Sequence, residues 1–305
     1  MPVHRVLILS KHAAAYRQLV EAARLPDLEI VSDASACEIA FGEPSLIAPK
    51  LSALTSLGWA QATWAGVEPL LDPSLRRDYV LTNARGVFGA LMSEYVFGYL
   101  LAHERKILEK HASQLRREWD PAPPGTLGGK WIGLVGVGTI GASIARTAKH
   151  FGMRVKGYTR SSAGCPDVDA YFHGGDRAVF AQDLDYLVTV APNTAGTRGL
   201  VDRALLAALP PRAVVINPGR GSILDEAALA EALRDGRLAG AVLDVFQKEP
   251  LPPDHAFWQT PNLLITSHTA ALSIPEDIAP VFIDNYRRWI AGQPLKYQVD
   301  FEAGY

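Results

Sequence analysis

Short apolar segments alternate with amphipathic stretches along almost the whole chain. Apolar runs typical of strands begin at Arg5 to Leu9 and recur at 28–31, 37–41, 59–63 and 79–82. After the first of these, His12 to Arg24 places apolar residues at helical spacing and ends before a proline. Strands that alternate with helices are typical of a parallel sheet covered by helices. The pattern therefore predicts an α/β unit in the first part of the chain.

The same alternation begins again after an interruption. Leu91 to His111 predicts one long helix, and the proline-rich segment 121–125 after it is a linker signal. Apolar runs then predict a second set of strands, at 131–135, 154–158, 186–190, 213–217, 240–243 and 263–266. Helices are expected at 225–234 and at 275–291. The sequence thus predicts a second α/β unit.

A glycine-rich turn follows the first strand of this second unit. Gly136, Gly138 and Gly141 form the pattern G-x-G-x-x-G, and a helix with regularly spaced apolar residues continues to Gly152. Glycines at these positions allow the backbone to approach a pyrophosphate, which binds at the helix N-terminus. The turn therefore predicts a dinucleotide site. Because this domain begins near residue 100, the part before it is expected to be the substrate-side domain.

Composition restricts the class of protein. A length of 305 residues suggests two domains, and a net charge of −2 argues against nucleic-acid binding. Two distant cysteines argue against a disulfide scaffold and fit a reducing compartment. The most apolar region, 87–102, is interrupted by polar residues, and no signal peptide is recognised. We expect a cytoplasmic protein without a membrane span, and no spacing of ligand residues predicts a metal site.

Three segments after later strands carry candidate catalytic side chains. Arg220 follows a buried strand in a Pro-Gly turn, and its planar guanidinium suits a carboxylate. Glu249 follows the next strand, and His268 follows the one after that. Ligands of an open α/β sheet bind at the carboxyl ends of the strands, so we expect all three side chains at one cleft. A histidine held by a carboxylate is a typical general acid.

Together these segments resemble the D-isomer-specific 2-hydroxyacid dehydrogenase family, over essentially the whole chain. The motifs that carry the resemblance are the glycine turn, N-x-x-R-G at 217–221, D-V-F-x-x-E-P at 244–250 and H-x-A at 268–270. Further likenesses to the glyoxylate/hydroxypyruvate reductase A group of this family lie at 64–68, 94–99, 249–253 and 298–300. The order of the motifs is far more specific than any one of them.

The resemblance implies a fold and a reaction. The fold consists of two doubly wound parallel-sheet domains, in which a Rossmann dinucleotide-binding domain (98–275) is inserted into a flavodoxin-like substrate domain (1–97 plus 276–305). The reaction is NADPH-dependent reduction of a small 2-keto acid to the D-2-hydroxy acid. The family is commonly dimeric, so we expect a homodimer in which the apolar helix at 91–102 takes part.

The resemblance also implies roles for single residues. Arg220 corresponds to the arginine that holds the substrate carboxylate and carbonyl, His268 to the proton donor, and Glu249 to the carboxylate that orients this histidine. Ala65 and Gly66 correspond to the loop whose N–H groups meet the substrate carboxylate. The cofactor-binding residues that it implies, with Asp244 near the nicotinamide carboxamide, are Gly136, Gly138, Thr139, Ile140, Gly141, Pro192, Thr197, Pro218, Gly219, Asp244, His268 and Ala270.

The end of the strand after the glycine helix distinguishes the two nicotinamide cofactors. A domain that binds NAD places an acidic residue about 20 residues after the glycines, where it holds the ribose 2′-OH. Thr159 occupies this position, eighteen residues after Gly141, and Arg160 follows. Arg160 can pair with a 2′-phosphate, and Thr159 and Ser161 can donate hydrogen bonds to it. We predict NADPH over NADH, with NADH as the alternative.

The substrate is less well defined by the sequence. Trp64, beside the Ala65-Gly66 loop, and Phe41, at the end of an earlier strand, would form an aromatic wall that favours a small keto acid. Phe41 stands where the reductase A group is expected to have a tryptophan, so phenylpyruvate or a branched 2-keto acid is an alternative. Glu249 argues against formate oxidation, for which related enzymes use glutamine, while phosphite oxidation is harder to exclude. From another class, a nucleotide-sensing, corepressor-like binding module is the remaining alternative.

Overall fold

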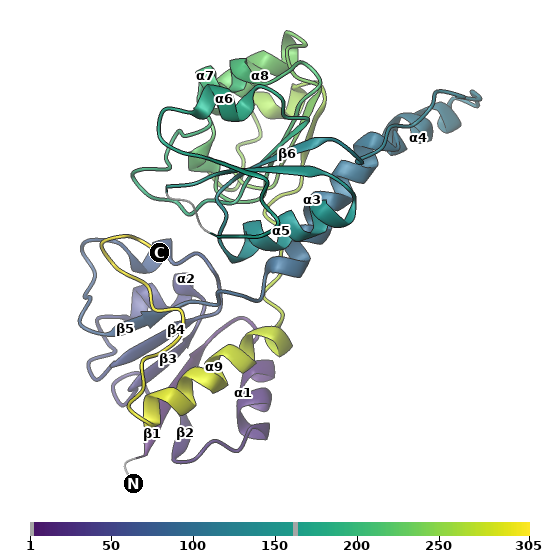
Figure 1. Cartoon of the computed structure of the whole chain (residues 1–305). Coiled ribbons are helices and arrows are strands. Elements are labelled where there is room, and N and C mark those ends of the chain that lie inside the picture. Colours follow the sequence, from purple (N-terminus) through teal and green to yellow (C-terminus); the bar gives the residue numbers. More distant parts are fainter. Residues whose placement is uncertain (1–2, 161–163) are drawn as a thin grey trace. The chain divides into compact units, whose positions relative to one another are not determined.

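The computed structural model describes residues 3–160 and 164–305 (Figure 1). The chain divides into two compact units, of which unit 1 comprises Met1–Phe88 with Leu272–Tyr305 and unit 2 comprises Gly89–Ala271. Unit 2 is therefore inserted into unit 1. The expected boundary after residue 97 falls inside one continuous helix, Gly89–Glu104. This helix packs along the core of unit 2, so all of it belongs to that unit.

Unit 1 is built on a five-stranded parallel sheet with the order β2-β1-β3-β4-β5. This is the flavodoxin-like strand order, as predicted. The strands are β1 His4–Leu9, β2 Leu28–Val31, β3 Ile39–Gly42, β4 Trp59–Ala62 and β5 Val80–Thr82. The helices are α1 Ala13–Ala22, α2 Pro44–Ile47, α9 Pro275–Ile290 and the single 3-10 turns η1 Ala48–Lys50 and η2 Glu68–Leu70. The carboxyl-terminal segment adds to the sheet beside β5, where Val299 N–H donates to the Leu81 carbonyl at 2.8 Å.

Aromatic rings fill the space between this sheet and its helices. The Phe41 ring stacks on Phe282 of α9 with centroids 4.4 Å apart, and Trp59 stacks on the same ring at 5.4 Å. Tyr16 of α1 meets Phe41 edge-on at 4.8 Å. Phe41 is completely buried by these contacts. The prediction that it forms a substrate wall is therefore wrong, because both faces of the strand are covered and the ring packs under α9.

Unit 2 is built on a seven-stranded parallel sheet with the order β12-β11-β10-β9-β6-β7-β8. The strand order reverses between β6 and β9, as in a Rossmann fold, and ligands bind such sheets at this switch point. The strands are β6 Trp131–Val135, β7 Arg154–Tyr158, β8 Ala170–Phe172, β9 Tyr186–Thr189, β10 Val214–Asn217, β11 Gly240–Leu243 and β12 Leu263–Ile265. The pattern of apolar residues predicted all of these except the short edge strand β8.

The helices of unit 2 cover both faces of its sheet. They are α3 Gly89–Glu104, α4 Ile107–Leu115, α5 Thr139–His150, α6 Arg177–Ala181, α7 Arg203–Ala208, α8 Glu226–Arg234 and the single turns η3 Gly221–Ile223 and η4 Ala256–Gln259. The helix predicted at 91–111 is in fact two helices, because Lys106 adopts a left-handed backbone with φ of 53°. Beyond it, α4 extends away from the rest of its unit (Figure 1).

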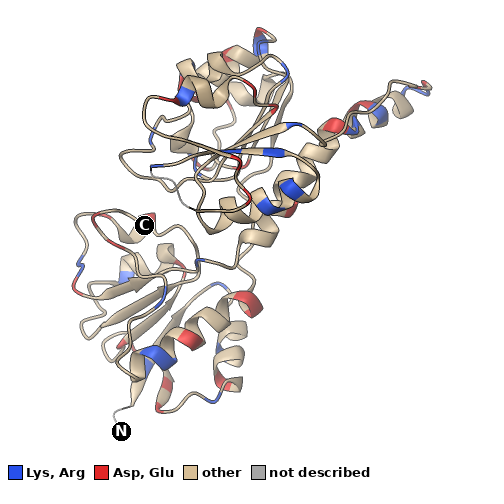
Figure 2. Cartoon of the chain, in the orientation of Figure 1, with Lys and Arg blue, Asp and Glu red and all other residues tan. Residues whose placement is uncertain are grey.

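Positions of Lys and Arg and positions of Asp and Glu are interspersed over the helices and loops of each unit (Figure 2). Within the described residues, no helix is both long and apolar enough to cross a membrane.

Candidate active site

The glycine turn lies between β6 and α5, at the switch point of the unit 2 sheet. Gly136 has φ of +98°, and a Cβ there would lie 2.8 Å from the backbone of Ala191. A Cβ on Gly141, in the first turn of α5 with Thr139 and Ile140, would lie 2.3 Å from the Gly136 carbonyl oxygen. A Cβ on Gly138, in contrast, would have no heavy atom within 4 Å.

The first and third glycines are thus required by the chain's own packing, while the second borders open space. This is the division of roles expected when the backbone at the second glycine approaches a pyrophosphate. The turn therefore fits the dinucleotide that the sequence predicts.

Two loops flank this turn. After β7, the N–H of Thr159 donates to the Phe172 carbonyl at 3.1 Å, and Arg160 follows directly. After β9, the Thr197 hydroxyl donates to the Pro192 carbonyl at 2.6 Å, while it accepts from the Thr194 N–H at 2.9 Å. The Thr197 hydroxyl thus closes its own loop. The predicted contact of Ser161 with the cofactor lies outside the described residues.

The loop that presents Arg220 is organised by Asn217, the last residue of β10. Asn217 is completely buried, and its Oδ1 accepts from the Thr189 hydroxyl at 2.5 Å and from the Gly219 N–H at 3.1 Å. Its Nδ2 donates to the Arg220 carbonyl at 3.0 Å. Gly219, after Pro218, approaches β9 so closely that a Cβ would lie 2.6 Å from the Thr189 carbonyl oxygen. These contacts fix the backbone on which the arginine stands.

Glu249 and His268 form a hydrogen-bonded pair. His268 Nδ1 lies 2.7 Å from Glu249 Oε2, and the other carboxylate oxygen, Oε1, accepts from the Phe246 N–H at 2.9 Å. An ionised carboxylate only accepts hydrogen bonds, so Nδ1 carries the hydrogen of this contact. The pair therefore orients the ring and directs Nε2 away from the carboxylate. More than half of the His268 side chain is exposed, as a group that meets a substrate must be.

Asp244 anchors the loop that carries His268. Its carboxylate is almost completely buried, and Oδ1 accepts from the Thr266 hydroxyl at 2.5 Å and from the Thr269 N–H at 2.7 Å. Oδ2 accepts from the Ala270 N–H at 2.9 Å, and the Asp244 carbonyl accepts from the His268 N–H at 2.6 Å. In the structure, Asp244 thus holds the loop that carries His268.

This anchor is needed because the loop has an unfavourable backbone conformation. Ser267 and His268 have φ of 57° and 59°, in the left-handed region that side chains disfavour. From the other side, the Tyr95 hydroxyl of α3 lies 2.8 Å from the Thr266 hydroxyl. Burial raises the pKa of Tyr95 well above its ordinary value. Tyr95 therefore stays a neutral hydrogen-bonding partner.

The loop predicted to bind the substrate carboxylate belongs to unit 1 and follows β4. Asn83 Nδ2 donates to the Ala65 carbonyl at 2.9 Å, and the Ala84 N–H donates to the Trp64 carbonyl at 3.0 Å. Within the described residues, the N–H groups of Ala65 and Gly66 donate no hydrogen bond. The loop is thus held by its carbonyl groups, while its donors are available to an anion.

Sequence reasoning named the residues that carry charge and missed those that support them. Asn217, Thr266 and Tyr95 are the main examples in unit 2. Asn217 stands inside the N-x-x-R-G motif, and its position at a strand end is a signal that could have predicted its role. Thr266 directly follows β12 and carries the same strand-end signal, whereas Tyr95 lies within α3 and shows none.

Comparisons with known proteins agree with this geometry. The model of the D-isomer specific 2-hydroxyacid dehydrogenase NAD-binding domain matches residues 97–270. Glyoxylate/hydroxypyruvate reductase A of Serratia proteamaculans is 35% identical over 253 residues, which are 80% of each chain. The corresponding enzyme of Salmonella heidelberg is 31% identical over 263 residues, 84% of this chain and 82% of the relative.

Solved structures are similar over the full length. A family member from Aeromonas salmonicida has a TM-score of 0.93 at 41% identity, covering 98% of this chain and 99% of that one. An NADPH-dependent glyoxylate/hydroxypyruvate reductase from Sinorhizobium meliloti, in complex with NADP and sulfate, has a TM-score of 0.88 at 29% identity, covering 99% and 100%. The chain therefore belongs to the D-isomer-specific 2-hydroxyacid dehydrogenase family, whose members are oxidoreductases that interconvert 2-hydroxy acids and 2-keto acids.

Proposed function

We propose that this protein uses NADPH to reduce glyoxylate, hydroxypyruvate or a similarly small 2-keto acid to the D-2-hydroxy acid. The observation that carries the proposal is the 2.7 Å contact between His268 Nδ1 and Glu249 Oε2, because it leaves an oriented imidazole for proton transfer at the same carboxyl edge of the sheet as the glycine turn. The curated relatives named glyoxylate/hydroxypyruvate reductase A support the choice of a small keto acid.

The proposed chemistry divides the work between cofactor and protein. When bound, the reduced nicotinamide supplies the hydride that adds to C2 of the keto acid. Arg220 holds the carboxylate and the carbonyl oxygen, so that the carbonyl carbon is presented in one orientation. His268 gives a proton from Nε2 to the carbonyl oxygen as negative charge develops there, while Glu249 stabilises the imidazolium. The N–H groups of Ala65 and Gly66 bind the substrate carboxylate.

The residues proposed to hold the cofactor are grouped by its parts. Backbone N–H groups at the glycine turn and the first turn of α5 would bind the pyrophosphate. Thr159 and Arg160 would bind the 2′-phosphate, since no acidic residue follows β7 directly to repel it. The remaining proposed contacts of the cofactor are Pro192, Thr197, Pro218, Gly219, Asp244, His268 and Ala270.

The test is the consumption of NADPH and NADH with glyoxylate, hydroxypyruvate, phenylpyruvate and a branched keto acid. We expect the highest kcat/KM for NADPH with the two small acids. Arg160→Ala should lower kcat/KM for NADPH about tenfold or more and leave that for NADH unchanged, because one charge-assisted hydrogen bond is worth about 1.5–3 kcal/mol. An NADH preference of the wild-type protein would contradict the cofactor proposal. NADPH binding without turnover of any keto acid would favour a nucleotide-sensing module.

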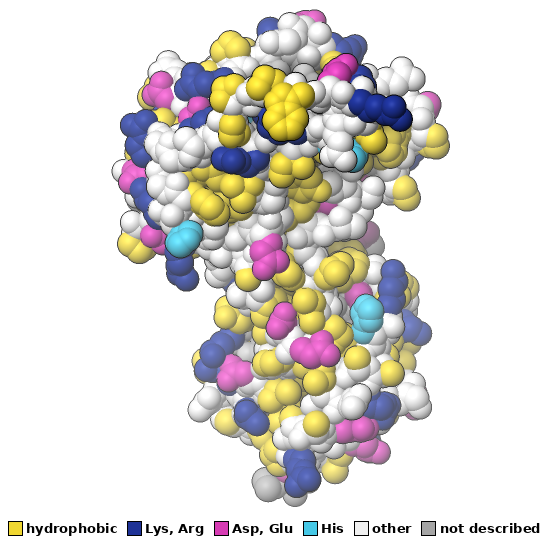
Figure 3. All heavy atoms as spheres, turned by 90° about the vertical axis from the view of Figure 1, so that its right-hand side faces the viewer, with side chains coloured by type: hydrophobic (Ala, Val, Ile, Leu, Met, Phe, Trp, Pro, Cys, Tyr) yellow, Lys and Arg dark blue, Asp and Glu magenta, His cyan; other side chains and the backbone are white. Residues whose placement is uncertain are grey.

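We also propose that the protein forms a homodimer through α4 and the segment after it. Figure 3 views the chain from the side toward which α4 points. Ile107, Leu108 and Leu115 of α4 are more than half exposed, and Trp119, which follows α4, is 93% exposed. Side chains of this size on a projecting arm are typical of a protein interface. A second copy offers the same arm, so sedimentation should find a dimer, and Trp119→Ser with Leu115→Ser should shift it toward monomer.

A further inference from the structure

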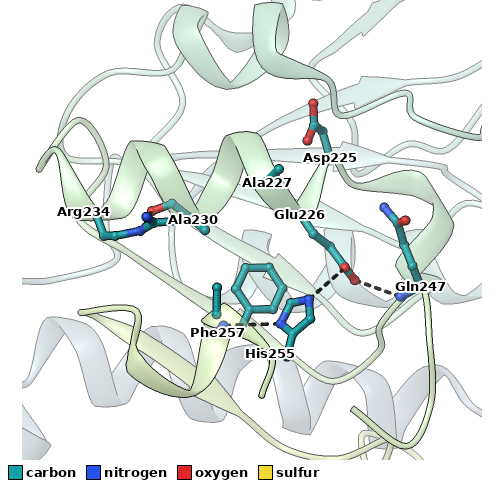
Figure 4. Close-up of a pocket in the computed structure, with 9 residues that line it drawn as sticks. Asp225, Glu226, Ala227, Ala230, Arg234, Gln247, His255 and Phe257 are labelled. Carbon is teal, nitrogen blue, oxygen red and sulfur yellow. Dashed lines mark hydrogen bonds and ion pairs between the residues drawn. The ribbon is translucent and has the colours of Figure 1, made fainter. Parts of the chain in front are cut away.

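A pocket of about 410 Å³ lies in unit 2, apart from the glycine turn, between the start of α8 and the turn η4. Figure 4 shows its lining, in which Glu226 of α8 points toward His255 and the backbone of Gln247. Only 14% of the Glu226 side chain is exposed. Gln247 belongs to the segment 244–250, the acid loop, which ends on Glu249 and Pro250. A mostly buried side chain thus brings its carboxylate to the loop of a predicted catalytic residue.

Both oxygens of Glu226 are engaged. Oε1 accepts from the Gln247 N–H at 2.8 Å, and Oε2 lies 3.6 Å from His255 Nε2. His255 Nδ1 accepts from the Phe257 N–H at 3.3 Å, so the ring hydrogen is on Nε2, the nitrogen that faces Glu226. Glu226 lies in the first turn of α8, where the helix dipole favours an acidic side chain. Glu226 is therefore held in place from the η4 side while it binds the acid loop.

The same loop rests on the segment that follows Arg220. Gln247 Nε2 donates to the Leu224 carbonyl at 3.0 Å. A Cβ on Gly221 would lie 1.9 Å from the Phe246 carbonyl carbon, so the two backbones are in direct contact. One peptide further, the Phe246 N–H donates to Glu249 Oε1. The position of the Glu249 side chain thus depends on the backbone at residues 246 and 247. The N–H of Gln247 in this stretch is bound by Glu226.

We propose that Glu226 is a positioning residue for the reaction, which acts on His268 through the acid loop and Glu249. It binds the Gln247 N–H, keeps the loop seated on Gly221, and so sets the distance between Glu249 and His268. This inference rests on the proposed role of Glu249. It predicts that the hydrogen-bond acceptor of Glu226 is required and that its charge is not.

The test compares three substitutions on one helix. Glu226→Ala removes the acceptor, Glu226→Gln keeps an acceptor oxygen for the Gln247 N–H, and Glu231→Ala removes an acidic side chain from the exposed part of α8. At saturating NADPH and glyoxylate, we expect kcat of Glu226→Ala to fall about tenfold or more, since small misplacements of catalytic groups are costly. The kcat of Glu226→Gln and of Glu231→Ala should stay within about twofold of the wild-type value, because neither change removes the acceptor that holds the acid loop. The Kd for NADPH should not change.

A double-mutant cycle separates positioning from general destabilisation. If Glu226 acts through Glu249, then Glu226→Ala should cost little further kcat in a Glu249→Ala background, in which the contact with His268 is already lost. If Glu226→Ala lowers kcat by the same factor with and without the substitution at Glu249, the proposal is overturned. A wild-type kcat in Glu226→Ala would also overturn it.

Amide hydrogen exchange gives a readout without turnover. Exchange at residues 246–249 should accelerate in Glu226→Ala and not in Glu226→Gln or Glu231→Ala; unchanged exchange would contradict the inference. If the wild-type chain reduces no keto acid, the proposed function fails, while hydrogen exchange still decides whether Glu226 holds the loop.

Discussion

Asp244→Asn tests how the loop that carries His268 is held. Asparagine keeps the shape of the side chain but replaces one oxygen by an NH₂ donor. Whichever way the amide turns, either the Ala270 N–H or the Thr269 N–H then meets a donor in place of an acceptor. Because Asp244 is 1% exposed, water cannot compensate. One buried N–H without an acceptor costs about 1–3 kcal/mol.

The size of the effect of Asp244→Asn follows from comparing the free-energy cost of the lost hydrogen bond with the strain in the loop. Ser267 and His268 both have left-handed backbone angles, and such a conformation costs about 1–2 kcal/mol for each residue. The loop therefore stores about 2–4 kcal/mol, which is comparable with the lost hydrogen bond. We expect the loop to relax in the variant, so that His268 loses its position. The expected result is a Tm lowered by a few degrees and a kcat lowered about 10- to 100-fold.

The assay measures kcat with glyoxylate, the Kd for NADPH and Tm on the same preparation. Asp202→Asn is the matched control, because Asp202 caps α7 and asparagine is an equally good cap. A wild-type kcat with a lowered Tm would refute the reasoning, since the loop would then not depend on its anchor for catalysis. A large rise in Kd with unchanged kcat would show that contact with the cofactor is the main role of Asp244.

Other predictions address the remaining parts of the site. Arg220→Lys should lower kcat/KM by about tenfold to a hundredfold and mainly raise KM, because an ammonium cannot bind a carboxylate with two parallel hydrogen bonds; an unchanged KM would contradict this. Gly138→Ala should leave the Tm of the cofactor-free protein unchanged and weaken NADPH binding, whereas Gly141→Ala should lower that Tm, because its Cβ would lie 2.3 Å from a backbone oxygen. Burial raises the pKa of the Cys37 thiol to about 11, so iodoacetamide at pH 9.0 should label the half-buried Cys165 first. The unfolded thiol ionises at lower pH than the folded one, so this burial should also reduce stability as pH rises from 9.0 to about 11.

Most of the fold could be predicted from the sequence because its signals are local. A strand buried on both faces is a continuous apolar run, and the glycine turn has a fixed spacing between β6 and α5. The break between α3 and α4 gave no such signal, because Lys106 is an ordinary helix former that here adopts a left-handed backbone. The assignment of Phe41 to a substrate wall failed because the contact that decides its role is made by a residue distant in the chain. An aromatic residue at a strand end fits a pocket or a core equally well, and only the position of Phe282, far away in the chain, decides for the core.

The side chains predicted to be catalytic could be singled out because charged residues at strand ends are unusual, whereas the groups that support them form a row that the sequence conceals. The Thr189 hydroxyl donates to Asn217 at the end of β10, whose carbonyl accepts from the Asp244 N–H at 3.0 Å. The Asp244 carboxylate then accepts from the Thr266 hydroxyl, which lies beside the Tyr95 hydroxyl. Thr189, Asn217, Asp244 and Thr266 each stand at or just after the end of a strand, and the first three each bond to the member on the next strand over. Tyr95 joins this row from the middle of α3.

This row places the starting points of the arginine loop, the acid loop and the histidine loop relative to one another, and Thr189, Asn217 and Asp244 in it are buried. Arg220, Glu249 and His268 follow a few residues later on those loops, where their side chains are at least partly exposed. A largely buried row that fixes the bases of the three loops explains why the loops can be short and partly strained and still hold defined positions. It follows that substitutions in the row should change kcat by moving the catalytic groups together, whereas substitutions at the loop tips should affect one group at a time.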